Sequence, residues 1–162
     1  MPTTSKGLRY PASSAAPNVP QDIQNLASDI DTRFTRFNQF SVGWNATTIA
    51  GLNNITTNSI TVPAQSGPYL LVAHVGVLST MNGTTIPTLQ LLVNGAIKAQ
   101  QLFTGITTTN SNHSRELSRS IYVSDGSSRT VQGRIDIPSG ATVTTYTDDT
   151  HSYVSVFTIP MW

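Results

Sequence analysis

The chain has 162 residues, a length that fits one domain of ordinary size with a small appendage, and only 10% of them are charged. The net charge of +1 and the lack of a Lys/Arg cluster argue against a nucleic-acid partner, and no apolar stretch nears the roughly 20 residues that span a bilayer. Cysteine is absent, which excludes disulfides, zinc ribbons and thiol chemistry. The 24 Thr and 18 Ser residues favour β-structure, so we expect a β-rich structural or binding protein rather than an enzyme.

Residues 1–19 are predicted to form an extended arm. They contain three prolines among small residues and show neither helical nor strand periodicity. Proline restricts itself and the residue before it to extended backbone. One cluster in the arm is suited to anchoring on a partner surface: Leu8, Arg9, Tyr10 and Pro11. In that role Leu8 and Tyr10 would make apolar contacts and Arg9 would fix orientation, whereas the alternative is a frayed terminus.

Residues 20–38 are predicted to form a short helix, because Pro20 suits a first helical turn and Asp22 complements the helix dipole. Its apolar positions have the spacing of a heptad seam: Ile23, Leu26, Ile30 and Phe37. A helix this short is marginal in water on its own. We therefore expect the seam to form a short coiled coil with other copies, and Ile23 and Ile30 are compatible with more than two strands. The alternative is a helix that packs against its own domain.

Residues 39–162 are predicted to form an antiparallel β-sandwich, because short apolar runs alternate with turn signals at intervals of about 8–12 residues. Asn94-Gly95 lies between two apolar runs and predicts a two-residue hairpin turn that requires positive φ. The expected strands are 40–44, 58–62, 69–79, 88–93, 96–103, 116–123, 129–137, 142–146 and 152–159.

Two features of this domain indicate a permanent interface. The strand from Tyr69 to Leu78 is apolar on both faces, and residues 37–97 contain no Asp, Glu, Lys or Arg. A strand that is apolar on both sides needs a cover beyond its partner sheet, and charge depletion is typical of interface centres. Self-association explains both features. The alternative is a Thr-, Ser- and Asn-rich surface that is solvated without charges.

No catalytic constellation is found. There is no G-x-S-x-G motif, and His74, His113 and His151 lie in unrelated contexts without metal-ligand spacing. His74 is expected to be a hydrogen-bonded core or interface residue. The pair Asp148-Asp149 is interpreted as a turn, since no full calcium ligand set accompanies it. The sequence therefore predicts no catalytic residue, no metal site and no cofactor, and it leaves any ligand-binding residues unknown.

Two parts of the chain resemble known families. Residues 6–11 (KGLRYP) and 16–27 (APNVPQDIQNLA) resemble the N-terminal segment of tail-fibre, head-fibre and minor tail proteins of bacteriophages that infect actinobacteria. The apolar strand from Tyr69, the hairpin 89–101 and the closing strand 153–159 resemble the C1q/TNF-type jelly roll. The second resemblance implies an all-β antiparallel jelly-roll sandwich that forms a homotrimer, here preceded by the arm and the coiled-coil helix.

Together the resemblances imply a non-enzymatic structural component of a bacteriophage virion. It would be a homotrimeric appendage on the particle surface, anchored through its arm to a capsid or tail protein, with no nucleic-acid contact and no membrane insertion. A head decoration protein and a head or tail fibre both stay open, as does binding of a host-surface glycan or protein. The alternative class is a soluble module that recognises a saccharide or protein through loops such as 107–112; it predicts a monomer.

Overall fold

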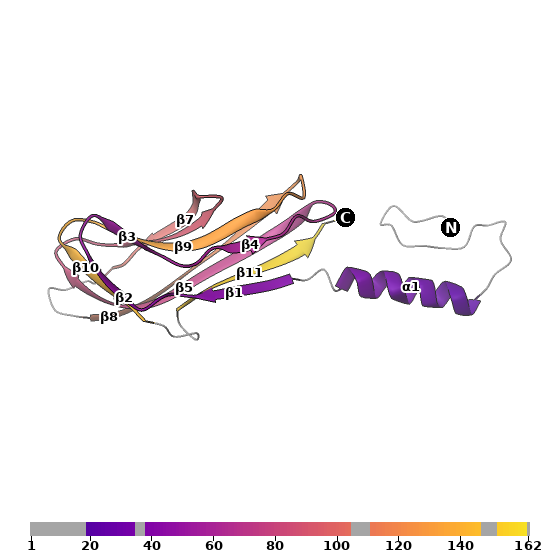
Figure 1. The fold of residues 1–162 in the computed structure, drawn as a ribbon, viewed down its shortest axis with the longest axis horizontal. Helices are drawn as coiled ribbons and strands as arrows, with labels where there is room; N and C mark the ends of the chain where they lie inside the picture. Colours follow the sequence, from indigo (N-terminus) through magenta and orange to yellow (C-terminus); the bar gives the residue numbers. More distant parts are fainter. Residues whose placement is uncertain (1–18, 35–37, 105–110, 147–151, 162) are drawn as a thin grey trace.

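The computed structural model describes residues 19–34, 38–104, 111–146 and 152–161. Within them it contains one helix, α1 (Val19–Phe34), and two packed sheets (Figure 1). No helix in this described part is long and apolar enough to cross a bilayer. The strands are β1 (Asn38–Gly43), β2 (Thr47–Ala50), β3 (Asn53–Thr56), β4 (Ile60–Val62), β5 (Tyr69–Gly83), β6 (Thr88–Val93), β7 (Ala96–Leu102), β8 (Ser111–Val123), β9 (Arg129–Ile137), β10 (Ala141–Thr145) and β11 (Tyr153–Pro160).

The larger sheet is built around β5. On one edge β5 pairs with β11 along its first half and with β10 along its second half, while β8 pairs along the other edge. Strand β1 continues the sheet beyond β11, and β2 continues it beyond β10. The smaller sheet has the order β3-β9-β6-β7, with β4 also on β9. Every pairing among the described strands is antiparallel, and this is a jelly-roll sandwich, so the predicted all-β antiparallel jelly-roll class is confirmed.

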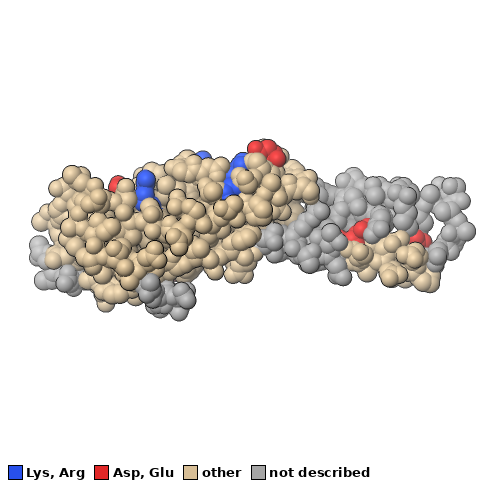
Figure 2. All heavy atoms as spheres, viewed as in Figure 1, with Lys and Arg blue, Asp and Glu red and all other residues tan. Residues whose placement is uncertain are grey.

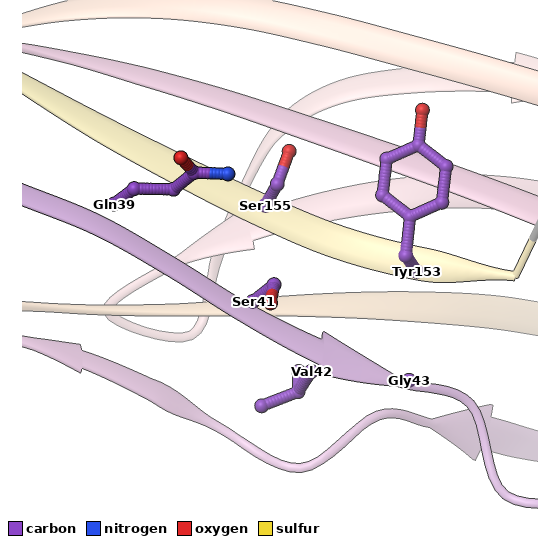
Figure 3. A pocket seen from close by; sticks show the side chains of 6 residues that line it. All are labelled: Gln39, Ser41, Val42, Gly43, Tyr153 and Ser155. Atoms are coloured by element: carbon purple, nitrogen blue, oxygen red, sulfur yellow. The ribbon is translucent and has the colours of Figure 1, made fainter. Parts of the chain in front are cut away.

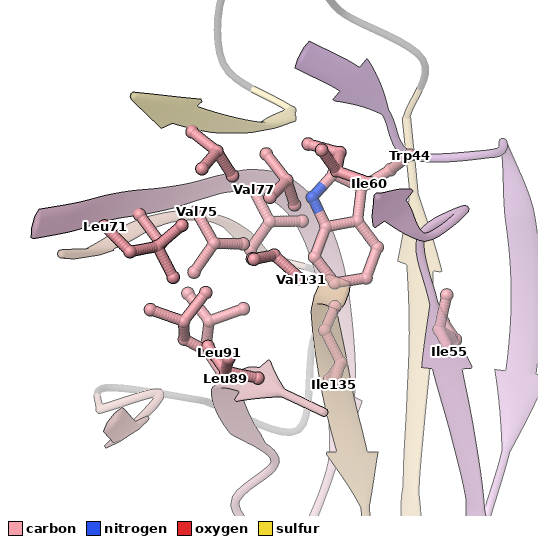
Figure 4. Close-up of a cluster of buried hydrophobic side chains, with 14 of the residues drawn as sticks. Trp44, Ile55, Ile60, Leu71, Val75, Val77, Leu89, Leu91, Val131 and Ile135 are labelled. Atoms are coloured by element: carbon pink, nitrogen blue, oxygen red, sulfur yellow. The ribbon is translucent and has the colours of Figure 1, made fainter. Parts of the chain in front are cut away.

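The core lies between the two sheets because side chains alternate between the faces of each strand. Along β5, odd-numbered residues from Tyr69 to Val77 are fully buried, and they meet Leu89, Leu91 and Ile135 of the smaller sheet. Figure 4 shows Trp44 among the aliphatic side chains of this cluster. Its Nε1 donates to the carbonyl of Gly76 at 2.8 Å, which satisfies the buried indole.

The Asn94-Gly95 turn is as predicted. The two residues have φ values of 49° and 74°, and Val93 pairs with Ala96 across the turn. Two left-handed residues form a hairpin turn whose twist matches that of strands β6 and β7. The Asn94 side chain also connects the turn to β9, since its Oδ1 accepts a hydrogen bond from the Thr130 amide at 2.8 Å.

Other strand boundaries differ from those predicted. Strands β2 and β3 were missed, because they are four residues each, rich in Thr and Asn, and joined by Gly51 and Leu52 in left-handed conformation. The predicted strand 58–62 was too long, since only Ile60–Val62 pairs. Strand β5 continues to Gly83 and β8 starts at Ser111, so both are longer than their hydrophobic runs. Backbone pairing extends these two strands beyond the apolar pattern.

Candidate functional site

The larger sheet has one side on the core and one side that faces away from it, which we call the open face. Strand register assigns its central residues: Gln39, Ser41 and Gly43 on β1; Tyr153, Ser155, Phe157 and Ile159 on β11; Leu70, Val72, His74, Gly76, Leu78 and Thr80 on β5; Asn112, Ser114, Glu116, Ser118, Ser120 and Tyr122 on β8. Glu116 is the one charged residue among them. The face drawn in Figure 2 also shows few charged side chains among the described residues.

One part of the open face is apolar. Cross-strand neighbours form a continuous group there, because Leu70 pairs with both Tyr122 and Ile159, and Val72 pairs with Phe157. We call these five residues the apolar patch. Tyr122 is 59% exposed and Phe157 is 39% exposed, while the other three are partly buried. A single chain therefore leaves the patch in contact with water.

A polar cluster occupies the middle of the open face, where His74 connects three strands. The rings of His74 and Tyr153 are stacked, with centroids 5.4 Å apart and 18° between their planes. Their polar atoms also meet, since the Tyr153 hydroxyl lies 3.3 Å from His74 Nε2. On the other side, Glu116 Oε2 lies 3.7 Å from the same nitrogen. The prediction for His74 placed it in the core or an interface; it lies on the open face, partly buried and hydrogen-bonded.

Next to this cluster the open face is hollowed along β1 and β11. The hollow has a volume of about 540 Å³ and is lined by Gln39, Ser41, Val42, Gly43, Tyr153 and Ser155. In Figure 3 the side chains of Gln39, Ser155 and Tyr153 stand on the same side of the two strands. The hollow exists because Gly43 has no side chain and the two serines are small.

Burial raises the pKa of Tyr153, and the nearby Glu116 carboxylate raises it further. The folded chain thus holds the phenol proton more tightly than the unfolded chain. The stability that this contributes is present below the usual tyrosine pKa of about 10 and is lost as the pH rises through the folded value. We expect Glu116→Gln to lower the Tyr153 pKa in a site-resolved NMR titration, with the raised pKa of Tyr69, to which Glu116 does not contribute, as the control. An unchanged Tyr153 pKa would contradict an electrostatic interaction between the Glu116 carboxylate and the Tyr153 phenol.

The residues predicted for anchoring and trimerisation are only partly described. Leu8, Arg9, Tyr10 and Pro11 lie outside the described residues, as does Phe37. In α1 the apolar side chains of Ile23 and Leu26 are 62% and 40% exposed. The backbone of Ile30 belongs to the same helix. Figure 1 shows α1 beyond the end of the sandwich.

The residues of the hollow were missed by sequence reasoning. Gln39, Ser41 and Ser155 are common surface residues, and 114 positions separate Ser41 from Ser155, so only the β1–β11 pairing brings them together. The available signal was Tyr153 at the start of an alternating strand. In the described part of the chain, no three His, Asp or Glu side chains are grouped to hold a metal ion. The loop 107–112 proposed for ligand binding lies largely outside the described residues, as does Asp148-Asp149.

No family model and no curated protein sequence matches the chain. Solved structures with a similar fold include Eiger TNF from S. frugiperda, with a TM-score of 0.45, 9% identity, and coverage of 78% of this chain and 95% of that one. Dimeric latent PorU from Porphyromonas gingivalis has a TM-score of 0.49 and 12% identity over 76% of this chain, which spans only 12% of PorU. The enzymatically active domain of bacteriophage CBA120 tailspike protein 4 has a TM-score of 0.30 and 13% identity, covering 77% of this chain and 20% of that one. At these identities the likeness concerns the fold alone.

Proposed function

We propose that this protein is a non-enzymatic structural component of a bacteriophage virion. It forms a homotrimeric appendage on the particle surface, held by its N-terminal arm to a capsid or tail protein. The arm docks, α1 sets the register of three chains, and the jelly roll projects from the particle. Three arms on one trimer turn weak docking into tight attachment, because the second and third arms bind at high effective concentration.

The observation that carries the proposal is apolar surface left uncovered in one chain. It occurs twice, along the α1 seam at Ile23 and Leu26 and in the apolar patch of the open face. Both are near the same end of the molecule, since α1 lies beyond the end where β1 begins and β11 finishes (Figure 1). A second and a third copy would cover both surfaces around one axis. Because these surfaces carry little charge, few charged groups would lose their water.

The nature of the arm supports a virion location. Residues 6–11 and 16–27 carry the resemblance to fibre and minor tail proteins of actinobacteriophages. The arm precedes α1, so three arms would leave the trimer at one end, opposite the far end of the sandwich. That arrangement suits attachment to one site on a particle.

Solution mass tests the assembly and imaging tests the location. Light scattering of the full chain is expected to give three times the 17.4 kDa chain mass over a range of concentrations. A stable mass of one chain would overturn the proposal and favour a monomeric binding module. Electron microscopy of particles with and without the protein then separates the two placements. Density lost from the shell identifies a head decoration, density lost from the tail identifies a tail component, and no loss of density contradicts the virion role.

A further inference from the structure

We propose that the hollow on β1 and β11 binds a neutral saccharide. This deepens the proposed function, because it gives the surface appendage a ligand. The hollow lies toward the β1 margin of the open face and adjoins the apolar patch, because Gln39 pairs with Phe157. Binding itself requires only the folded jelly roll, which allows the two proposals to fail separately.

The first argument is the aromatic platform. Tyr153 stands between two glycines, since its partners across the sheet are Gly43 on β1 and Gly76 on β5. Neither Gly43 nor Gly76 has a side chain that could pack against the Tyr153 ring. His74 stacks on the ring at 5.4 Å and fixes its orientation, and the side of the ring toward β1 borders the hollow. An exposed, oriented aromatic face offers the apolar surface on which the C–H face of a sugar ring can pack.

The second argument is the set of polar groups around that platform. Gln39 supplies an amide, and Ser41 and Ser155 supply hydroxyls, which together donate and accept hydrogen bonds. Within the described part of the chain these three side chains make no hydrogen bond to another residue. They are therefore free to bond the hydroxyl groups of a ligand. These amide and hydroxyl groups complement the hydroxyl groups around the edge of a pyranose ring.

Size and charge narrow the class of ligand. The volume of about 540 Å³ lies in the range of about 300–1,000 Å³ usual for small-molecule sites. Among the described residues no Lys or Arg lines the hollow, so this part of its wall offers no cation for a phosphate, a sulfate or a carboxylate. Among the described residues, the Glu116 carboxylate acts on Tyr153, so it repels acidic sugars and can accept a hydrogen bond from a hydroxyl. A neutral mono- or disaccharide fits these walls best.

Saturation-transfer NMR on the full chain tests the proposal with named probes: the methyl β-pyranosides of glucose, galactose and mannose, and methyl β-glucuronide. At least one neutral probe is expected to bind, with transfer strongest to the ring C–H protons, and the glucuronide is expected to bind more weakly. Tyr153→Ala should abolish transfer. Gln39→Ala should weaken binding about tenfold through lost hydrogen bonds. Ser118→Ala, an exposed position on β8 of the same face, is the matched control and should bind as the wild type does.

The outcomes separate the two proposals. The saccharide site is overturned, and the trimer is not, if the trimer binds no neutral probe. The same holds if the Tyr153→Ala trimer still binds a probe. A monomer that binds a probe through Tyr153 and Gln39 supports the site and overturns the trimeric appendage. Folding of each variant is checked by its circular dichroism spectrum and its thermal midpoint. Because Tyr153 lies outside the core cluster but stacks on His74, Tyr153→Ala should keep the spectrum and lower the thermal midpoint only slightly.

Discussion

Val72→Asp is expected to turn the proposed trimer into folded monomers. Val72 is partly buried in a single chain and pairs with Phe157 inside the apolar patch. Covered by a neighbouring copy, the new carboxylate would lose its water without gaining a partner, because the open face has no Lys or Arg on its described strands. An unpaired buried charge costs several kcal/mol, and a symmetric trimer would bear that cost three times. In the separated chain the carboxylate stays hydrated.

The measurement is solution mass by light scattering, with circular dichroism to show that the fold is kept. Thr61→Asp is the matched control, since it places the same charge at an exposed position of β4 in the other sheet and should leave the mass unchanged. Leu26→Asp makes the equivalent change in the α1 seam. If Val72→Asp remains trimeric while Leu26→Asp dissociates, the helix alone holds the copies together and the patch is not an interface. If neither dissociates, self-association uses another surface.

Gly133→Ala is expected to destabilise the fold by about 1–3 kcal/mol through overpacking. Gly133 lies on β9, next to the buried Trp44 side chain and to core side chains of the larger sheet. A Cβ at this position would lie 2.7 Å from Val75 Cγ2, 2.8 Å from Trp44 Cζ2 and 3.0 Å from Val154 Cγ2. These neighbours are fully buried core side chains, so none can move away without disturbing others.

The backbone at Gly133 is also held in place. Its amide donates to the Thr57 hydroxyl and its carbonyl accepts from the Thr57 amide, both at 3.0 Å. Strand β9 therefore cannot shift to make room for a methyl group. Denaturant unfolding at one fixed protein concentration measures the effect. Gly67→Ala is the control, because no atom lies within 4 Å of a Cβ there. Equal stability of the two variants would contradict the close approach of the sheets.

The sequence predicted the site less well than the fold. His74 was singled out because a histidine inside an apolar strand is unusual, yet its partners Tyr153 and Glu116 lie 79 and 42 positions away. The hollow was not predicted, since serines and glutamine are ordinary surface residues and a glycine opposite an aromatic ring becomes visible only through strand register. For the helix, the heptad spacing of Ile23 and Leu26 could be predicted from the sequence. The exposure of their side chains could not, because it depends on where α1 lies.

By itself, the sequence determined the local structure: an all-β architecture from composition and alternation, the Asn94-Gly95 turn from backbone chemistry, and an amphipathic helix from periodicity. These features depend on residues close together in the chain. Only the tertiary structure decided which side of the larger sheet is open, that Tyr153, His74 and Glu116 come together there, and that Gln39 lies on the same face. Four strands distant in sequence carry those residues, and a slip of one residue in any of their pairings would turn its side chains toward the core.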